Sequence, residues 1–175
     1  GRDEDSKEFF DKMRNGARVS TAALNSENYR EIFEPLFEAG EEILYIAFSS
    51  KMSGTFNYLD VTIKELQEKY PNAKYQRFDT LSISWGTGIQ VYLAAKYFNE
   101  GHTIDETVKF LENLRDRVGL CFSVDNLEYL KRGGRISPVA AAFGNLLQLK
   151  PVLKVADGSL CVASKEKGKK KEVVS

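Results

Sequence analysis

An unbroken apolar run near residue 45 places the strongest constraint on what this chain can fold into. Ile43 to Ala47 follow one another without a polar interruption. A strand with one solvated face alternates apolar and polar residues, whereas a parallel strand that is covered on both faces reads as a continuous apolar run. The segment therefore predicts a β-strand over 42–48 that has protein on both of its faces.

Helical and strand-like segments alternate along most of the chain. Periodicity, capping residues and Gly or Pro stops predict helices over 5–15, 26–39, 55–70, 86–98, 103–118 and 137–147. Strands are expected over 42–48, 74–79 and 119–124, and Asp157-Gly158 predicts a hairpin turn between 151–156 and 160–163. The order is typical of the α/β class, with a mostly parallel sheet flanked by helices and part of a second α/β domain after it. We place the boundary after residue 118, which gives an N-terminal domain over 1–118 and a partial second domain over 119–175.

Composition excludes several classes of function. The chain has 42% hydrophobic and 29% charged residues, and its 25 basic residues balance 25 acidic ones, so no general attraction to nucleic acid is expected. No apolar run is long enough to form an integral membrane segment. Cys121 and Cys161 both lie in apolar strand-like segments, which favours small buried side chains over a disulfide and hence a reducing, cytoplasmic location.

Hydroxyl side chains gather where the predicted strand over 42–48 ends. Ser53, Gly54 and Thr55 lie between this strand and the next helix, and ligands of open α/β sheets bind beyond the carboxyl ends of the strands. The N-terminus of a helix favours an anion, the two hydroxyls add hydrogen-bond donors, and a glycine lets a ligand approach the backbone. The alternative is that Ser53 or Thr55 only caps the helix.

Two further loops repeat this chemistry. Ser20-Thr21 ends the segment over 17–21; if that segment is a strand of the same sheet, its hydroxyls could hold one carboxylate or phosphate together with Ser53, and otherwise they only stabilise a turn. In the loop after 74–79, Asp79 is expected to orient neighbouring hydroxyls, and Trp85 is expected to form a wall of the core.

The sequence argues against catalysis and against a metal centre. A serine nucleophile needs a positioned base, and the only histidine, His102, lies in a turn that we expect to be exposed. No Gly-x-Ser-x-Gly elbow occurs, and the Ser-Lys-Met-Ser-Gly-Thr loop lacks the Gly-Lys pair of a phosphate-binding loop. One histidine and two separated cysteines give no zinc-ligand set. We therefore predict a binder of a small anionic ligand, with no catalytic residue and no metal.

Several blocks of sequence carry a resemblance to a known family. Ser49 to Thr55 reads Ser-Ser-Lys-Met-Ser-Gly-Thr, close to the family motif Ser-Ser-x-Leu-Ser-Gly-Thr, and Ser20-Thr21 stands where the family has Thr-Ser. Leu127 to Ile136, with Lys150 to Leu153 beyond it, forms the most specific block. In these features the chain resembles the bacterial DegV family over nearly its whole length.

The resemblance implies two α/β domains that hold a fatty acid between them. Ser20, Thr21 and Ser53 would hydrogen-bond the carboxylate, helped by the backbone N–H groups of Gly54 and Thr55. The protein would be a lipid-binding carrier rather than an enzyme. It would present a long-chain fatty acid to a separate fatty acid kinase, whose acyl phosphate product feeds phospholipid synthesis. The fatty acid would be the only bound group, without a further cofactor.

The resemblance also places the acyl chain in an apolar tunnel. Ile136 and Phe143 lie on a helical stripe that could line this tunnel, although core packing explains the stripe equally well. Arg132 and Arg135 flank a glycine pair and could contact the kinase or the mouth of the pocket; the alternative is that they bind backbone carbonyls.

The chain departs from the family pattern at both ends, and two alternative functions remain open. Gly1 is not preceded by the strand that opens the family's first domain, and family members continue past Ser175, so we expect a fragment that leaves apolar surface uncovered. One alternative function is a site for another small anion, such as a different carboxylate or a phosphate ester. The other is a hydrolase or transferase that uses Ser53 as its nucleophile.

Overall fold

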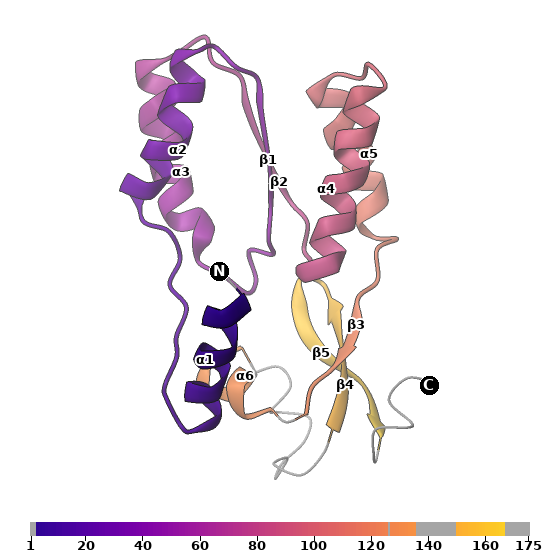
Figure 1. Ribbon diagram of the computed structural model, residues 1–175. Helices are drawn as coiled ribbons and strands as arrows, with labels where there is room; N and C mark the ends of the chain where they lie inside the picture. Colours follow the sequence, from indigo (N-terminus) through magenta and orange to yellow (C-terminus); the bar gives the residue numbers. More distant parts are fainter. Residues whose placement is uncertain (1–2, 126, 136–149, 167–175) are drawn as a thin grey trace.

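The computed structural model describes residues 3–125, 127–135 and 150–166. Its elements follow the predicted alternation of helices and strands (Figure 1). They are α1 (Asp3–Arg14), α2 (Ser26–Glu38), β1 (Ile43–Ala47), α3 (Thr55–Lys69), β2 (Tyr75–Asp79), α4 (Ser84–Asn99), α5 (Ile104–Arg115), β3 (Cys121–Ser123), α6 (Glu128–Arg132), β4 (Lys150–Ala156) and β5 (Ser159–Glu166). The chain is therefore an α/β protein, as predicted.

A parallel pair of strands forms the centre of the first part of the chain. β1 and β2 pair in parallel, in a register that aligns Ile43 with Tyr75 and Ala47 with Asp79. Helices α2 and α3 lie on one side of these strands and α4 and α5 on the other (Figure 1). The apolar run of β1 thus has helices on both faces, which confirms the interpretation of its unbroken sequence.

Each face of β1 packs into a different core. Ile43 belongs to a cluster with buried side chains of α2 and α3, which we call the α2–α3 core: Tyr29, Phe33, Phe37, Ile43, Leu59, Ile63 and Leu66. Leu44 and Ile46 pack on the opposite face against the α4–α5 core, formed by Phe78, Ala94 and Leu111. Successive side chains of a strand point to opposite faces, so the five residues of β1 serve both cores.

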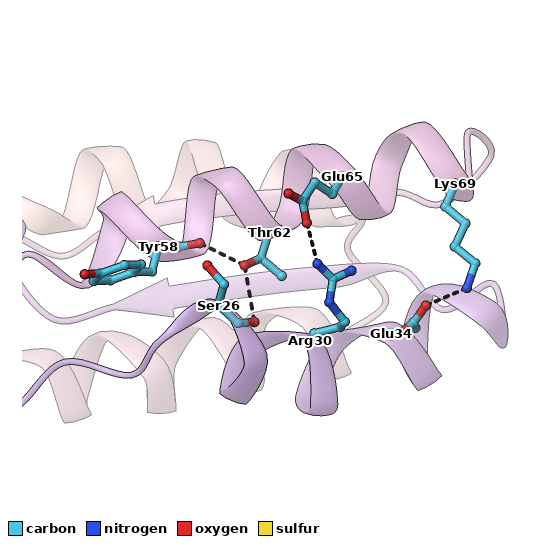
Figure 2. Close-up of polar contacts among 7 residues, drawn as sticks. All are labelled: Ser26, Arg30, Glu34, Tyr58, Thr62, Glu65 and Lys69. Atoms are coloured by element: carbon cyan, nitrogen blue, oxygen red, sulfur yellow. Dashed lines mark hydrogen bonds and ion pairs between the residues drawn. The ribbon is translucent and has the colours of Figure 1, made fainter.

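Polar contacts join α2 and α3 at regular intervals, as Figure 2 shows. The Thr62 hydroxyl donates to the carbonyls of Tyr58 (2.9 Å) and Ser26 (3.4 Å). Further along the two helices, Arg30 pairs with Glu65, and Lys69 pairs with Glu34 at 2.7 Å. In each inter-helix pair the partners are 35 or 36 positions apart, so the two helices run in the same direction. Both therefore begin at the edge of the sheet where β1 ends.

A second, antiparallel sheet is built from β3, β4 and β5 in the order β3-β4-β5. The predicted hairpin is confirmed: β4 and β5 pair across Asp157 and Gly158, whose φ angles of 50° and 78° suit a tight two-residue turn. Leu127, Leu153 and Leu160 form its core, here called the hairpin core. Met52 and Ile83 pack against this core from the loops that follow β1 and β2. The domain boundary after residue 118 stays a prediction.

Two expectations about local structure were wrong, the condition attached to a third is not met, and a fourth lies outside the described residues. Residues 17–25 form neither helix nor strand, so the condition that residues 17–21 form a strand of the sheet is not met. Trp85 is 82% exposed rather than a wall of the core. Cys121 is exposed and Cys161 half-buried, so the expectation that both are buried was wrong, whereas both are free thiols, in line with the expectation of no disulfide. Each is paired in register with Lys154 of β4. The predicted helix over 137–147 lies outside the described residues.

Candidate functional site

The loops that follow β1 and β2 are held together by one carboxylate. Asp79, the last residue of β2, accepts hydrogen bonds from the backbone N–H of Leu81 at 3.0 Å and of Ser50 at 3.3 Å. The prediction that Asp79 orients hydroxyls is therefore corrected: its partners are backbone amides, because both chain reversals leave N–H groups without a strand partner. Asp79 thus fixes the two loops relative to each other.

Ser49 connects the first of these loops to the hairpin. Its side chain is fully buried, and its hydroxyl donates to the Gly158 carbonyl at 2.7 Å while it accepts from the Lys51 N–H at 3.3 Å. Its backbone N–H donates to the Ser82 carbonyl at 3.0 Å. This role of Ser49 was not predicted, although Ser49 opens the Ser-Ser motif that carries the family resemblance.

The hairpin turn packs tightly against both loops. A Cβ added to Gly158 would lie 2.7 Å from Ser49 Oγ, 2.9 Å from Lys51 Cγ and 3.0 Å from Leu81 Cδ2. The first two distances are shorter than real Cβ contacts and the third is tighter than most, so neighbouring side chains would have to shift to accept a residue larger than glycine at this turn. The two sheets are therefore joined by direct packing at the carboxyl ends of β1 and β2.

Ser53 and Thr55 present their hydroxyls at the start of α3. The two oxygens lie 2.7 Å apart, and Ser53 Oγ also accepts from the Thr55 N–H at 3.3 Å. Gly54 occupies the N-cap position, and no side chain caps the helix there. The first turn of α3 therefore keeps N–H groups from which a ligand oxygen could accept. One O–H is used in the Ser53–Thr55 bond, so the hydroxyl pair has one O–H left to donate.

These hydroxyls line a cavity of about 600 Å³ that lies between the α2–α3 core and the hairpin core. This volume is within the usual range for small-molecule pockets. Its polar lining comprises Ser53 and Thr55 at the start of α3, Arg135 after α6, Thr21 before α2, and three tyrosines. The lining residues are Thr21, Ala22, Ala23, Leu24, Tyr29, Tyr45, Phe48, Met52, Ser53, Thr55, Ile83, Tyr129, Leu130, Gly133, Arg135 and Leu160.

The structure places the predicted hydroxyl residues unequally around this cavity. Thr21, Ser53 and Thr55 line it, whereas Ser20 is not part of the lining, although Ser20 and Thr21 are both exposed. Gly54 lies beside the lining residues as the N-cap of α3. Thr21 reaches the cavity from an extended connection between α1 and α2 rather than from a strand, so the neighbouring hydroxyls of Ser20 and Thr21 have different surroundings.

The two arginines also differ. Arg135 lines the cavity; its Nε donates to the Met52 carbonyl at 3.3 Å and its Nη1 to the Gly133 carbonyl at 2.6 Å. Arg132 instead pairs with Glu128 at 2.9 Å on the surface of α6. Binding to backbone carbonyls thus holds Arg135 at the cavity, beside the loop that carries Ser53. The predicted positions Ile136 and Phe143 lie outside the described residues.

Two tyrosines close one side of the cavity. Tyr29 is 2% exposed, and Tyr45 packs against the same α2–α3 core. Burial, followed by the neighbouring Tyr29 hydroxyl, raises the pKa of Tyr45 above its ordinary value. The Tyr45 phenol therefore stays protonated near neutral pH. The two tyrosines were not predicted because an aromatic residue in a strand or helix is ordinarily read as core packing.

No base or metal site is found near Ser53 within the described ranges. His102 stacks on Tyr97, with ring centroids 3.7 Å apart, and does not line the cavity. It is partly exposed, with Glu106 at 3.8 Å. Among the residues that the structure describes, no group of three or more His, Cys, Asp or Glu side chains could hold a metal ion. The described part of the chain also contains no helix that is long and apolar enough to cross a membrane.

Fold and site together define an α/β protein with a hydroxyl-bearing pocket at the carboxyl ends of its parallel strands. The chain belongs to the DegV family: the family's sequence model, described as "Uncharacterised protein, DegV family", matches residues 1–174. A DegV domain-containing protein of Clostridium perfringens is 44% identical over 168 residues, which are 95% of this chain and 58% of that protein. The chain thus spans less than two thirds of the length of this relative.

Solved structures share the fold. A DegV family protein from Thermus thermophilus, described for its fatty acid binding, is 33% identical with a TM-score of 0.82, over 95% of this chain and 58% of that one. The fatty acid kinase B3 protein of Streptococcus pneumoniae, loaded with linoleic acid, is 22% identical with a TM-score of 0.81, over 95% of this chain and 59% of its own. At that lower identity the likeness concerns the fold alone.

Proposed function

We propose that this protein binds a long-chain fatty acid and presents its carboxylate to a fatty acid kinase. The carboxylate would accept hydrogen bonds from the Thr21 hydroxyl, from the free O–H of the Ser53–Thr55 pair and from the N–H groups at the start of α3. Arg135 would add a positive charge at the same end of the cavity. The acyl chain would occupy the apolar remainder, and the fatty acid would be the only bound group.

The composition of the cavity is the observation that carries this proposal. Most of its lining is hydrocarbon or aromatic, and its few polar side chains include the adjacent Ser53–Thr55 pair, with Arg135 bonded to the same loop. One polar end and an apolar body match an amphipathic anion better than a compact one such as a phosphate ester. The fatty acid binding of the Thermus thermophilus relative, at 33% identity, supports the same ligand class.

The kinase partner is proposed from the chemistry of the cavity and from one solved structure of the same fold. A carrier that positions a carboxylate without a base or metal beside it leaves phosphorylation to another protein. The Streptococcus pneumoniae protein of the same fold carries fatty acid kinase in its name and linoleic acid in its structure. A kinase that phosphorylates the bound fatty acid would supply the catalytic residues, so the carrier itself would need none.

Extraction of the purified chain with organic solvent, followed by mass spectrometry, tests the ligand class directly. We expect long-chain fatty acids in amounts close to one per protein. After removal of this lipid, titration with a fluorescent fatty acid should restore the same occupancy. Recovery of no lipid, together with binding of a short polar anion in the same titration, would instead favour the alternative small-anion site.

Substitutions of Thr21 and Ser53 test the carboxylate site, and the neighbouring Ser20 supplies the control. Thr21→Ala combined with Ser53→Ala should weaken fatty acid binding by roughly 2–5 kcal/mol, because each removes a charge-assisted hydrogen bond of about 1.5–3 kcal/mol and the losses need not add. Ser20→Ala, one position away and outside the cavity lining, is the control and should leave the affinity unchanged. Equal affinities for all variants would contradict the assignment of the carboxylate to this end of the cavity.

The kinase step needs its own measurement. With a fatty acid kinase and ATP, the loaded protein should yield acyl phosphate, whereas the free fatty acid under the same conditions should not. Labelling of Ser53 by a serine-directed phosphonate would support the alternative of a Ser53-dependent hydrolase or transferase.

A further inference from the structure

Two tyrosines bring hydroxyl groups to a cavity whose lining is mostly hydrocarbon. Tyr29 belongs to the α2–α3 core, Tyr45 packs against that core, and both line the cavity. Other lining residues add only aliphatic or aromatic carbon: Ala22, Ala23, Leu24, Phe48, Ile83, Leu130 and Leu160. A phenol among such side chains forgoes the hydrogen bonds that it would make in water, so it gains from a polar atom that a ligand brings.

Tyr29 lies well beyond the start of α3, where the carboxylate is proposed to bind. Its neighbour Arg30 pairs with Glu65 across the two parallel helices (Figure 2). Glu65 follows Thr55, the first residue of α3, by ten positions, which corresponds to about 15 Å along the helix. Long side chains of a helix lean toward its N-terminus, so the Tyr29 ring covers part of that distance back to the cavity. The Tyr29 phenol therefore belongs to the wall beside the acyl chain and not to the carboxylate end.

A third phenol, that of Tyr75 in β2, lies next to this pair. Phe33 meets the rings of Tyr45 and Tyr75 edge-on, at centroid distances of 5.7 and 5.8 Å. The Tyr75 hydroxyl is buried, and it has no hydrogen-bond partner among the residues that the structure describes. Burial raises the pKa of Tyr75 above its ordinary value, so the hydroxyl keeps its proton, and Tyr45 and Tyr29 are close enough to act on it. The three tyrosines, which we call the phenol cluster, are thus short of one hydrogen-bond partner.

We propose that the phenol cluster is a subsite for a hydroxyl group on the acyl chain, so that the protein takes fatty acids hydroxylated in mid-chain. This inference rests on the fatty acid binding proposed above and specifies its substrate class. A hydroxyl both donates and accepts, so it would bond to Tyr29 and Tyr45 together, while Tyr75 would donate to the Tyr45 oxygen. In apolar surroundings such linked hydrogen bonds strengthen one another. A plain acyl chain offers no oxygen at this place.

Displacement of a fluorescent fatty acid by stearic acid and by three of its hydroxylated derivatives tests the proposal. The derivatives carry one hydroxyl next to the carboxylate, in mid-chain or at the terminal carbon. The unchanged protein should favour the mid-chain derivative over the other two. Tyr45→Phe keeps the ring and removes the hydroxyl, so it should lower the affinity ratio of the mid-chain derivative to stearic acid by about three- to tenfold, the value of one hydrogen bond. Tyr29→Phe should lower the same ratio.

Tyr70→Phe is the matched control. Tyr70 packs against the same α2–α3 core but does not line the cavity, so loss of its hydroxyl should leave the ratio unchanged. An unaltered ratio in Tyr45→Phe and Tyr29→Phe would overturn the proposal, as would a fall of the same size in Tyr70→Phe. Binding of all four acids without preference would remove the subsite but leave the proposed function standing, whereas binding of none would remove the proposed function itself.

Discussion

The loops after β1 and β2 are both rich in hydroxyl groups but use them in opposite ways. In the loop after β2, Thr80 is 1% exposed; its hydroxyl donates to the Ala47 carbonyl at 2.7 Å and accepts from the Ser82 N–H at 3.3 Å. In the loop after β1, Ser49 is similarly buried, but Ser53 and Thr55 turn their hydroxyls to the cavity. The Thr80 hydroxyl therefore serves structure alone, whereas the hydroxyls of the loop after β1 are divided between structure and the cavity.

The difference between the loops follows from the partners that the backbone leaves for each hydroxyl. The carbonyl of Ala47 and the N–H of Ser82 are buried and need partners that Thr80 can reach. Ser53 and Thr55, in contrast, satisfy each other at 2.7 Å and stay beside open space. A hydroxyl-rich strand end becomes a binding site only where its donors are not needed by the surrounding backbone.

Gly158→Ala should have the largest effect, because it disturbs the contact that both loops share. A Cβ at this position meets three side chains at 3.0 Å or less and requires φ of +78°, so we expect a loss of about 2–4 kcal/mol in the free energy of unfolding. Gly40→Ala is the matched control: its φ is +71°, and nothing lies within 4 Å of the added Cβ. Urea denaturation of both variants would separate crowding from backbone strain. Equal losses would show that the tight packing contributes nothing.

Thr80→Val should destabilise the fold without touching the ligand site. It leaves the buried Ser82 N–H without its acceptor and removes a donor from the Ala47 carbonyl, at a cost of about 1–3 kcal/mol. The fatty acid affinity of the folded protein should be unchanged, since Thr80 does not line the cavity. A large fall in affinity with unchanged stability would reverse the roles assigned to the two loops.

Asp79→Asn tests the link between the loops. The amide keeps one acceptor oxygen but loses the charge, so the bonds from Ser50 and Leu81 should weaken by about 1–2 kcal/mol in total. Chemical denaturation and fatty acid titration should both respond, because the Ser50 amide belongs to the loop that carries Ser53. A response in stability alone would mean that the two loops are not coupled through this carboxylate.

Ser53→Ala should give the smallest change in stability and a clear change in binding. Its hydroxyl is bonded only to neighbouring Thr55, so the free energy of unfolding should move by less than about 0.5 kcal/mol. Fatty acid affinity should fall by roughly tenfold or more, the value of one charge-assisted hydrogen bond. A stability loss as large as that of Thr80→Val would place Ser53 with the structural hydroxyls.

Local patterns predicted most of the elements correctly. Thr103 and Glu106 form the reciprocal capping box that the sequence predicts at the start of α5, and Asp157-Gly158 forms the hairpin turn. The unbroken run in β1 correctly indicated cover on both faces. The capping box and the hairpin turn depend on residues that are close in sequence, and the cover of β1 depends on the burial of a single strand. Such features can be predicted from a short stretch of sequence.

The candidate site was less predictable, because its geometry depends on distant partners. Ser20 and Thr21 are adjacent and chemically alike, yet only Thr21 lines the cavity, and the extended backbone after α1 decides this. Trp85 has the composition of a core residue but lies on an outward face at the first turn of α4. Ser49 is a structural residue only because a carbonyl 109 positions away meets it. No local signal distinguishes these cases.

The hydrogen bond between Ser49 and Gly158 also affects the order of folding and ligand binding. The two residues are 109 positions apart, so the intervening chain must be closed into a loop before they can meet. Contacts of such long sequence separation form late in folding. A chain that has emerged from the ribosome only as far as α4 already carries Ser53 and Thr55, but it has neither Leu160 nor Arg135 to enclose a ligand. Lipid capture would then begin only once the hairpin has docked, and bound lipid would mark the finished protein.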